Sequence, residues 1–68
     1  MQLSARNQMN GTITGIQLGG VMAEVTVDVN GQELVSVITR KSAENLGLQE
    51  GDSIVVVIKA TEVLLARD

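Results

Sequence analysis

An alternation of apolar and polar side chains over residues 21–29, broken only at Met22, limits the fold of this chain more than any other feature. A period of two is typical of a β-strand with one buried face. Asn30-Gly31 follows directly, and this pair favours a tight two-residue hairpin because both positions tolerate positive φ. We therefore predict that a strand over residues 33–38 pairs back on residues 21–29. The apolar positions of the pattern are Val21, Ala23, Val25, Val27 and Val29, and Met22, Glu24, Thr26 and Asp28 stand between them.

The rest of the chain divides into short segments. Residues 11–18 are rich in Thr and Ile and are predicted to form a strand that ends at the turn Gly19-Gly20. A short helix is predicted over residues 40–46, because Thr39 suits its N-cap and Gly47 a left-handed C-cap. The β-branched residues 53–58 are compatible with a fully buried strand, and residues 63–66 suggest a final short one.

The predicted order is three strands, one helix and two strands. This order is that of a mainly β, OB-like fold, a five-stranded small barrel with one short helix between strands 3 and 4. An SH3-like barrel is the structural alternative.

The length and composition predict a single domain over residues 1–68 that needs partner subunits. A chain of 68 residues buries too little surface to be comfortably stable without disulfides, metal ions or oligomerisation. It contains no cysteine and no histidine, which excludes disulfides and thiolate or imidazole metal sites. It also lacks aromatic residues, so the core is predicted to be aliphatic and the protein to be a homo-oligomer.

Composition also excludes several classes of function. No apolar stretch approaches the roughly 18 residues of a membrane span, and the N-terminus lacks a signal peptide, so we expect a cytoplasmic protein without membrane contact. A net charge of −3 and the missing aromatic side chains argue against nucleic acid as a partner. Without histidine or cysteine, and with scattered carboxylates, the chain is not expected to be an enzyme.

Two short segments at opposite ends of the sequence carry hydrogen-bond donors around a basic residue. They are Ser4-Ala5-Arg6-Asn7 and Ile58-Lys59-Ala60-Thr61, in a chain with only five basic residues. Guanidinium and ammonium groups supported by hydroxyls and backbone amides suit an oxyanion. We interpret the two segments as a shared anion site; the alternative is that Arg6 and Lys59 merely solvate strand ends.

The predicted helix start supplies a second group of donors. Thr39 and Ser42 place two hydroxyl groups one turn apart, while Arg40 and Lys41 put positive charge where the helix dipole favours acidic residues. An anion bound here would relieve that mismatch. The alternative is that Arg40 and Lys41 point into water, that Glu44 offsets them, and that Thr39 and Ser42 only cap the helix.

Three segments together resemble the molbindin, or Mop, family of molybdate-binding domains. They are SARNQMNGTITGI near the start, ITRKSAENLGLQEGD in the middle and VIKATEVLL near the end. The resemblance covers essentially the whole chain and preserves the order and spacing of the segments.

This resemblance implies a small OB-like barrel that assembles by strand exchange into a hexamer and binds molybdate, and often tungstate, between subunits. The oxyanion is the ligand, without direct ligation of the metal and without a cofactor. By the family pattern, one chain contributes Ser4, Ala5, Arg6, Lys59 and Ala60, with Thr61 as a further donor, and the neighbouring chain contributes Thr39 and Ser42. Relatives also hold oxyanion near a three-fold axis, for which Gly19-Gly20-Val21 offers backbone amides; the alternative is a simple hairpin turn.

The predicted function is intracellular molybdate or tungstate binding, storage and homeostasis, since the chain shows no attached DNA-binding or nucleotide-binding segment. A pocket made only of donors prefers a fully deprotonated dianion over phosphate, whose remaining proton needs an acceptor. The alternative is a structural or regulatory oligomeric interaction module that binds anions incidentally.

Overall fold

The sheet is built around its first strand, which pairs with a different neighbour along each half. In this computed structural model, which describes residues 4–68, the strands are β1 (Asn7–Leu18), β2 (Met22–Val29), β3 (Gln32–Thr39) and β4 (Ser53–Ile58). They form one antiparallel sheet in the order β3-β2-β1-β4. The helix α1 (Arg40–Leu46) lies between β3 and β4, as predicted, and a 3₁₀ turn η1 (Ala60–Glu62) follows β4.

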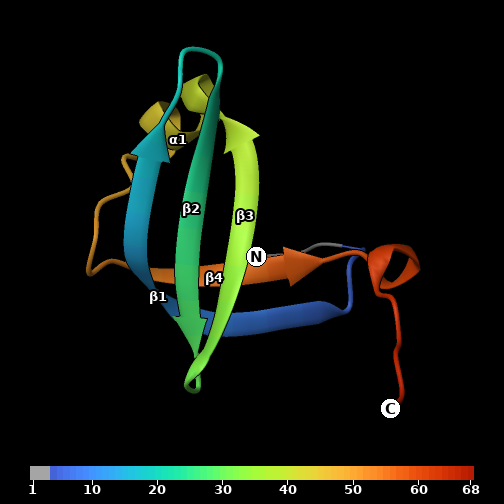
Figure 1. Ribbon diagram of the computed structural model, residues 1–68. Coiled ribbons are helices and arrows are strands. Elements are labelled where there is room, and N and C mark those ends of the chain that lie inside the picture. The colour runs from blue at the N-terminus through green and yellow to red at the C-terminus, as the bar shows by residue number, and fades with distance from the viewer. Residues whose placement is uncertain (1–3) are drawn as a thin grey trace.

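A two-stranded ribbon leaves the body of the sheet. Residues 7–12 of β1 pair with β4, and residues 12–18 pair with β2, with a β-bulge between Ile13 and Gly15. Figure 1 shows the ribbon crossing the three-stranded body and carrying η1 and the C-terminus at its tip, away from α1. The bulge bends β1, so that one continuous strand belongs to both the ribbon and the three-stranded body. β1 also begins four residues earlier than predicted.

The turns confirm the predicted backbone chemistry. Asn30 and Gly31 both have positive φ, 51° and 84°, as a two-residue hairpin between right-twisted strands requires. The helix begins after Thr39, whose side chain accepts the backbone N–H of Ser42, and ends at Gly47 in the left-handed region, with φ 63° and ψ 36°. The predicted bounds of the helix are therefore correct.

The core is aliphatic and centres on β1 and β2. Ile13, Val25, Val27 and Val29 form the buried cluster, and Ala23 is also buried, which confirms four of the five apolar positions predicted for residues 21–29. The prediction was wrong for Val21, which is 75% exposed because it belongs to the turn before β2 begins. Around the cluster pack the half-buried side chains of Met9, Ile16, Leu34, Ile38, Leu48, Ile54 and Val56.

The prediction of a fully buried strand over residues 53–58 was also wrong. Exposed and half-buried residues alternate along β4, and Val55 and Val57 are 39% and 40% exposed. The reason is that only one face of the ribbon is covered by the rest of the chain. A β-branched run was read as burial on both faces, although β-branched residues also suit a half-buried strand.

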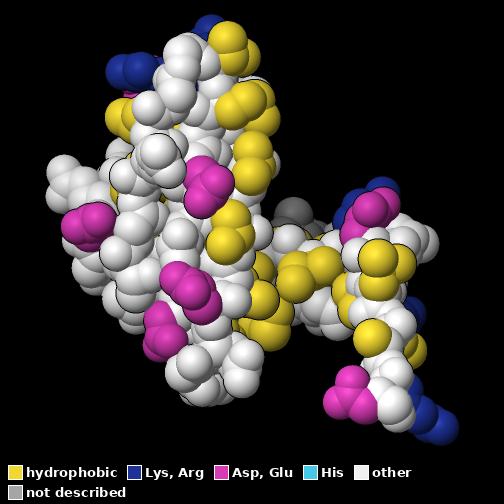
Figure 2. Space-filling model, viewed as in Figure 1, with side chains coloured by type: hydrophobic (Ala, Val, Ile, Leu, Met, Phe, Trp, Pro, Cys, Tyr) yellow, Lys and Arg dark blue, Asp and Glu magenta, His cyan; other side chains and the backbone are white. Residues whose placement is uncertain are grey.

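The fifth strand and a closed barrel are not present in the single chain. The described residues form four strands, and residues 63–66, predicted as the last strand, are extended without a ladder partner. After the 3₁₀ turn at Ala60–Glu62 the segment runs away from the body of the sheet (Figure 1), and hydrophobic side chains lie open along it (Figure 2). Leu64 and Leu65 are 91% and 93% exposed. Within residues 4–68, no helix has the length and apolar character needed to cross a membrane.

Candidate functional site

The tip of the β1–β4 ribbon brings together the two segments that carry the predicted donors. The last paired residues are Asn7 and Ile58, and one step further along each strand lie Arg6 and Lys59. Neighbouring strands are about 4.8 Å apart, so the two basic residues leave the ribbon side by side. The structure therefore unites Arg6 and Lys59 although 52 residues separate them in the sequence.

An open hollow of ≈ 390 Å³ lies at this tip. Arg6 lines it together with Ile58 and Val63 from the other segment, and its remaining walls are Asn7, Gln8 and Met9. Ser4 and Arg6 are exposed and Ala5 is half-buried, while Lys59, Ala60 and Thr61 are exposed. Five of these six residues are thus exposed at the tip, and Arg6 is the one that also lines the hollow.

Local hydrogen bonds shape the backbone on both sides of the tip. Gln8 donates its side-chain N–H to the carbonyl oxygen of Ala5 at 3.1 Å, and Glu62 donates its backbone N–H to the carbonyl oxygen of Lys59 at 2.9 Å. Sequence reasoning missed Gln8, although it directly follows the SARN segment. Asn7 begins the ladder of β1, opposite Ile58.

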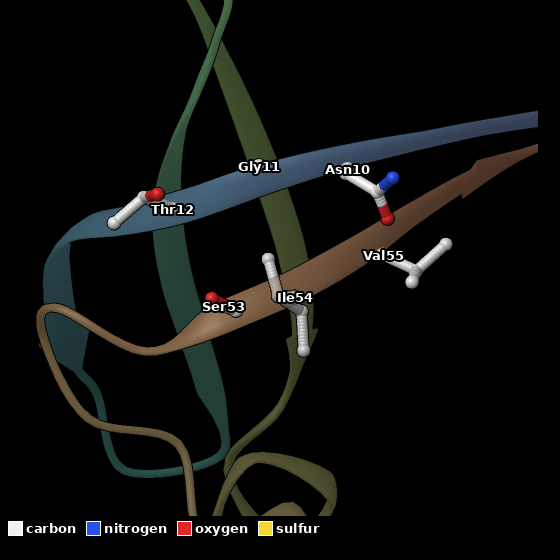
Figure 3. A pocket seen from close by; sticks show the side chains of 6 residues that line it. All are labelled: Asn10, Gly11, Thr12, Ser53, Ile54 and Val55. Carbon is white, nitrogen blue, oxygen red and sulfur yellow. The ribbon is translucent and has the colours of Figure 1, made fainter.

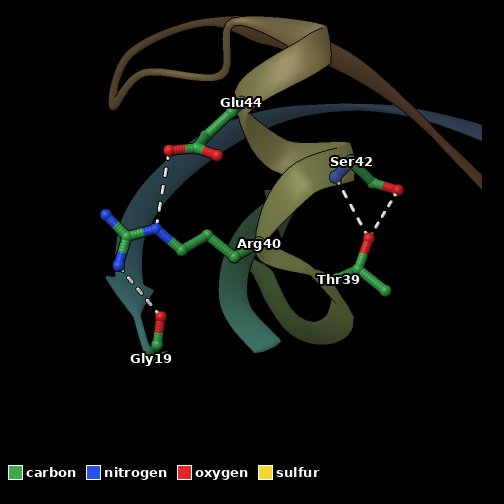
Figure 4. Close-up of polar contacts among 5 residues, drawn as sticks. All are labelled: Gly19, Thr39, Arg40, Ser42 and Glu44. Carbon is green, nitrogen blue, oxygen red and sulfur yellow. Dashed lines mark hydrogen bonds and ion pairs between the residues drawn. The ribbon is translucent and has the colours of Figure 1, made fainter. Parts of the chain in front are cut away.

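The second group of predicted donors lies at the start of α1. Thr39 Oγ1 accepts the backbone N–H of Ser42 at 3.1 Å and donates to Ser42 Oγ at 2.8 Å, as Figure 4 shows. Both side chains are exposed. The capping prediction for Thr39 is confirmed, and the same two hydrogen bonds hold the Ser42 hydroxyl beside it.

Arg40 has contacts that sequence reasoning did not foresee. Its guanidinium donates to the carbonyl oxygen of Gly19 at 3.1 Å, and its Nε lies 3.5 Å from Glu44 Oε2. Its backbone N–H also donates to the carbonyl oxygen of Val21 at 2.7 Å. The alternative in which Glu44 offsets this charge is correct for Arg40, but the side chain is fixed against the preceding turn.

The turn Gly19-Gly20-Val21, suggested as a second anion site, is bound tightly to its own chain. Gly19 donates its backbone N–H to the carbonyl oxygen of Met22 at 2.7 Å, and a Cβ on Gly19 would meet that oxygen at 3.0 Å. One of its three amides is therefore already used inside the turn. Anion binding at this turn stays a prediction.

The two groups of donors lie at opposite ends of the chain. The ribbon tip precedes β1, whereas Thr39 pairs with Met22, beyond the far end of β1. The twelve residues of β1 would span about 36 Å if the strand were straight, and Figure 1 shows α1 and the tip well apart. A single chain cannot place Arg6 and Ser42 around one small ligand.

The hollow along the ribbon between these ends offers no charged alternative. A hollow of ≈ 500 Å³ along the ribbon is lined by Asn10, Gly11, Thr12, Ser53, Ile54 and Val55, as Figure 3 shows. None of these six residues is basic, so this hollow lacks the cationic donors that an oxyanion prefers.

Comparisons with known proteins give one family and close relatives of similar length. The family model described as the TOBE domain matches residues 3–65. The chain is 39% identical over 66 residues to molybdenum-pterin-binding protein 1 of Clostridium pasteurianum, covering 96% of this chain and 97% of that protein. Among solved structures, a molybdate-binding protein from Sporomusa ovata superposes with a TM-score of 0.95 at 39% identity, covering 98% of this chain and 100% of that one.

A third similarity is to part of a longer chain. The cytoplasmic molybdate-binding protein ModG, in a crystal form with molybdate bound, matches with a TM-score of 0.82 at 44% identity. The match covers 88% of this chain and 43% of that one.

Proposed function

The chain belongs to the TOBE domain family, and we propose that it binds molybdate or tungstate as an oxyanion and does not transform it. The proposal is supported by the molybdenum-pterin-binding and molybdate-binding relatives, which match nearly the full chain at 39% identity. We propose further that residues 1–68 form a single Mop domain. It requires no cofactor.

The proposed site lies between two copies of the chain. One copy provides the ribbon tip, and its neighbour provides the start of α1. The observation that carries this proposal is the separation of the two donor groups by the length of β1. The donors are Ser4, Ala5, Arg6, Lys59, Ala60 and Thr61 from the first copy, and Thr39 and Ser42 from the second.

The chemistry of these groups suits a dianion. Arg6 and Lys59 provide two positive charges, and the remaining members provide hydroxyl or backbone N–H donors. Charge-assisted hydrogen bonds are about twice as strong as neutral ones. Because none of these residues carries a carboxylate, the site favours a fully deprotonated tetrahedral anion over hydrogen phosphate.

The site requires a homo-oligomer, which we propose to be a hexamer formed with strand exchange. Support comes from residues 63–66, where Leu64 and Leu65 are almost fully exposed. Both β3 and β4 are edge strands of the described sheet, and an edge strand readily accepts another strand. We propose that this segment supplies the fifth strand of a barrel completed between copies.

We propose that the role is storage and homeostasis of molybdate in the cytoplasm, without membrane or nucleic-acid partners. The similarity to ModG, a cytoplasmic molybdate-binding protein, supports this location. The net charge of −3 supports a local rather than a general attraction for anions.

Titration calorimetry of Arg6→Ala and Lys59→Ala with molybdate tests the assignment. Loss of one charged hydrogen-bond donor is expected to weaken binding by roughly 10- to 100-fold. Arg67→Ala removes one exposed positive charge outside the proposed donor set and serves as the control, with little change expected. Wild-type affinity in both tip variants would show that the anion binds elsewhere.

The exposed Leu64 and Leu65 also favour a second function, that of an interaction module whose assembly matters and whose anion is incidental. Competition between molybdate and sulfate in the assembled protein separates the two functions. A dedicated molybdate protein discriminates against sulfate, whereas an incidental site binds both anions about equally.

A further inference from the structure

Arg40 joins two segments that meet beside the hydroxyl pair of Thr39 and Ser42. Its backbone N–H binds the carbonyl oxygen of Val21, and its guanidinium binds that of Gly19. Its Nε lies 3.5 Å from Glu44 in the next turn of α1. Residue 40 therefore ties the 19–21 turn to the first turn of the helix.

The guanidinium does not face the hydroxyl groups. Figure 4 shows it extending toward Glu44 and Gly19, while the side chains of Thr39 and Ser42 lie on the opposite side of the helix start. Arg40 is consequently not placed as a direct donor to an anion held by those hydroxyls. Any effect on that anion passes through the backbone or through long-range charge.

The connection through the backbone from Arg40 to Thr39 is short. Thr39 is the last residue of β3 and pairs with Met22 of β2, and Met22 closes the 19–22 turn by accepting the N–H of Gly19 at 2.7 Å. By donating a hydrogen bond to Gly19, Arg40 therefore also restrains Met22, the first residue of β2, which pairs with Thr39. Thr39 keeps the extended conformation, with φ −69° and ψ 147°, in which its Oγ1 reaches the N–H of Ser42.

We propose that Arg40 is a positioning residue for the Thr39–Ser42 half of the molybdate site. This inference rests on the proposed function, because it assumes that these hydroxyls contact the anion. Two hydrogen-bonding nitrogens of one planar guanidinium reach two acceptors at once, and a lysine ammonium at the end of a flexible chain does not reproduce that geometry. Charge alone is therefore insufficient at position 40.

The neighbouring Lys41 provides a matched comparison. It carries the same charge one residue later, is exposed, and has no side-chain hydrogen bond or ion pair within the described residues. If the charge of Arg40 acted at long range, Lys41 would contribute similarly, and salt would screen both contributions. A positioning effect is specific to residue 40 and insensitive to salt.

The test measures molybdate affinity by calorimetry at low and at physiological salt for Arg40→Ala, Arg40→Lys and Lys41→Ala. We expect both substitutions of Arg40 to weaken binding by about 3- to 10-fold, the equivalent of one hydrogen bond, at either salt concentration. Lys41→Ala is expected to bind within about twofold of the wild type at physiological salt. In the unliganded Arg40→Lys protein, the backbone amide of Ser42 should also exchange its hydrogen faster.

A stability control separates a positioning effect of Arg40 from a loss of affinity caused by lower overall stability of the fold. Ile13→Val trims the largest fully buried side chain of the core, 1% exposed, and should lower the melting temperature without changing affinity. The inference is overturned if Arg40→Lys binds like the wild type, if Lys41→Ala loses as much affinity, or if Ile13→Val loses it too. Failure of the wild type to bind molybdate contradicts the proposed function itself, which is a different outcome.

Discussion

The hydroxyl oxygens of Thr39 and Ser42 lie 2.8 Å apart, with Thr39 as the donor. Thr39 Oγ1 also accepts a hydrogen bond from the Ser42 backbone N–H at 3.1 Å. The Thr39 hydroxyl group thus acts as a donor to Ser42 Oγ and as an acceptor for the Ser42 amide. Within the described residues, the hydroxyl proton of Ser42 is then available for an acceptor outside the chain. Ser42 therefore presents a free donor, whereas the Thr39 hydroxyl would have to turn its proton from Ser42 Oγ toward an anion in order to donate to it.

Replacing Thr39 by valine tests the contribution of the helix cap to stability and to molybdate binding. Thr39→Val keeps the shape of the side chain but removes the cap, which should lower the free energy of unfolding by about 1 kcal/mol and weaken molybdate binding. Thr39→Ser keeps the hydroxyl and should retain both properties. Urea unfolding at fixed protein concentration measures the first effect and calorimetry the second. Equal stability of the valine and serine variants would show that the cap is unimportant.

Much of the fold was predictable, because at several positions the local backbone conformation requires a particular residue type. Asn30, Gly31 and Gly47 have the positive φ values that the predicted hairpin turn and helix C-cap require. The burial of Ala23, Val25, Val27 and Val29 follows from the period-two pattern. The end of the chain was not predictable in this way, because a strand over residues 63–66 depends on a partner ladder and not on its own residues.

Gly11 lies on β1 where β2 leaves no room for a side chain. A Cβ there would lie 2.6 Å from Val27 Cγ1 and 2.9 Å from the carbonyl oxygen of Asp28. Because one of these atoms belongs to backbone, Gly11→Ala should destabilise the protein by about 1–3 kcal/mol. Gly20→Ala, where no atom lies within 4 Å of the added carbon, is the control and should change stability little. Thermal unfolding of both variants without ligand compares them directly.

The candidate site was predictable only in halves. Arg6 and Lys59 could be grouped by their similar surroundings, and the register of β1 with β4 brings them to one tip. That Thr39 and Ser42 join them is an expectation from family resemblance alone, because no pattern along one chain encodes a contact between two chains. The contact of Arg40 with Gly19 depends on how the 19–21 turn folds against the helix, so it had no sequence signal.

The exposed leucines near the C-terminus should control assembly. Exposed apolar side chains grouped in this way are typical of interaction surfaces, and Leu64 and Leu65 are 91% and 93% exposed. We expect Leu64→Asp combined with Leu65→Asp to shift the protein to smaller species in native mass spectrometry. The matched double substitution to methionine keeps apolar volume and should preserve the assembly. An aspartate variant that assembles like the wild type would exclude this segment from the interface.

Two inactive variants should restore each other if the molybdate site is shared between chains. Arg6→Ala damages the half at the ribbon tip, and Ser42→Ala damages the half at the helix start. Each variant alone should lose tight binding at every site. When the two are co-expressed and mix at random in a symmetric assembly, about one quarter of the sites combine an intact tip from one chain with an intact helix start from another.

Differently tagged copies allow the mixed assembly to be purified, and calorimetry then counts its tight sites. The expected number is well above zero, whereas either variant co-expressed with itself should show none. If Arg6 and Ser42 acted on the anion within one chain, every chain in the mixture would carry a damaged site and mixing would recover no tight binding. The length of β1 between the two residues argues for recovery, because only chain pairing brings the two halves together.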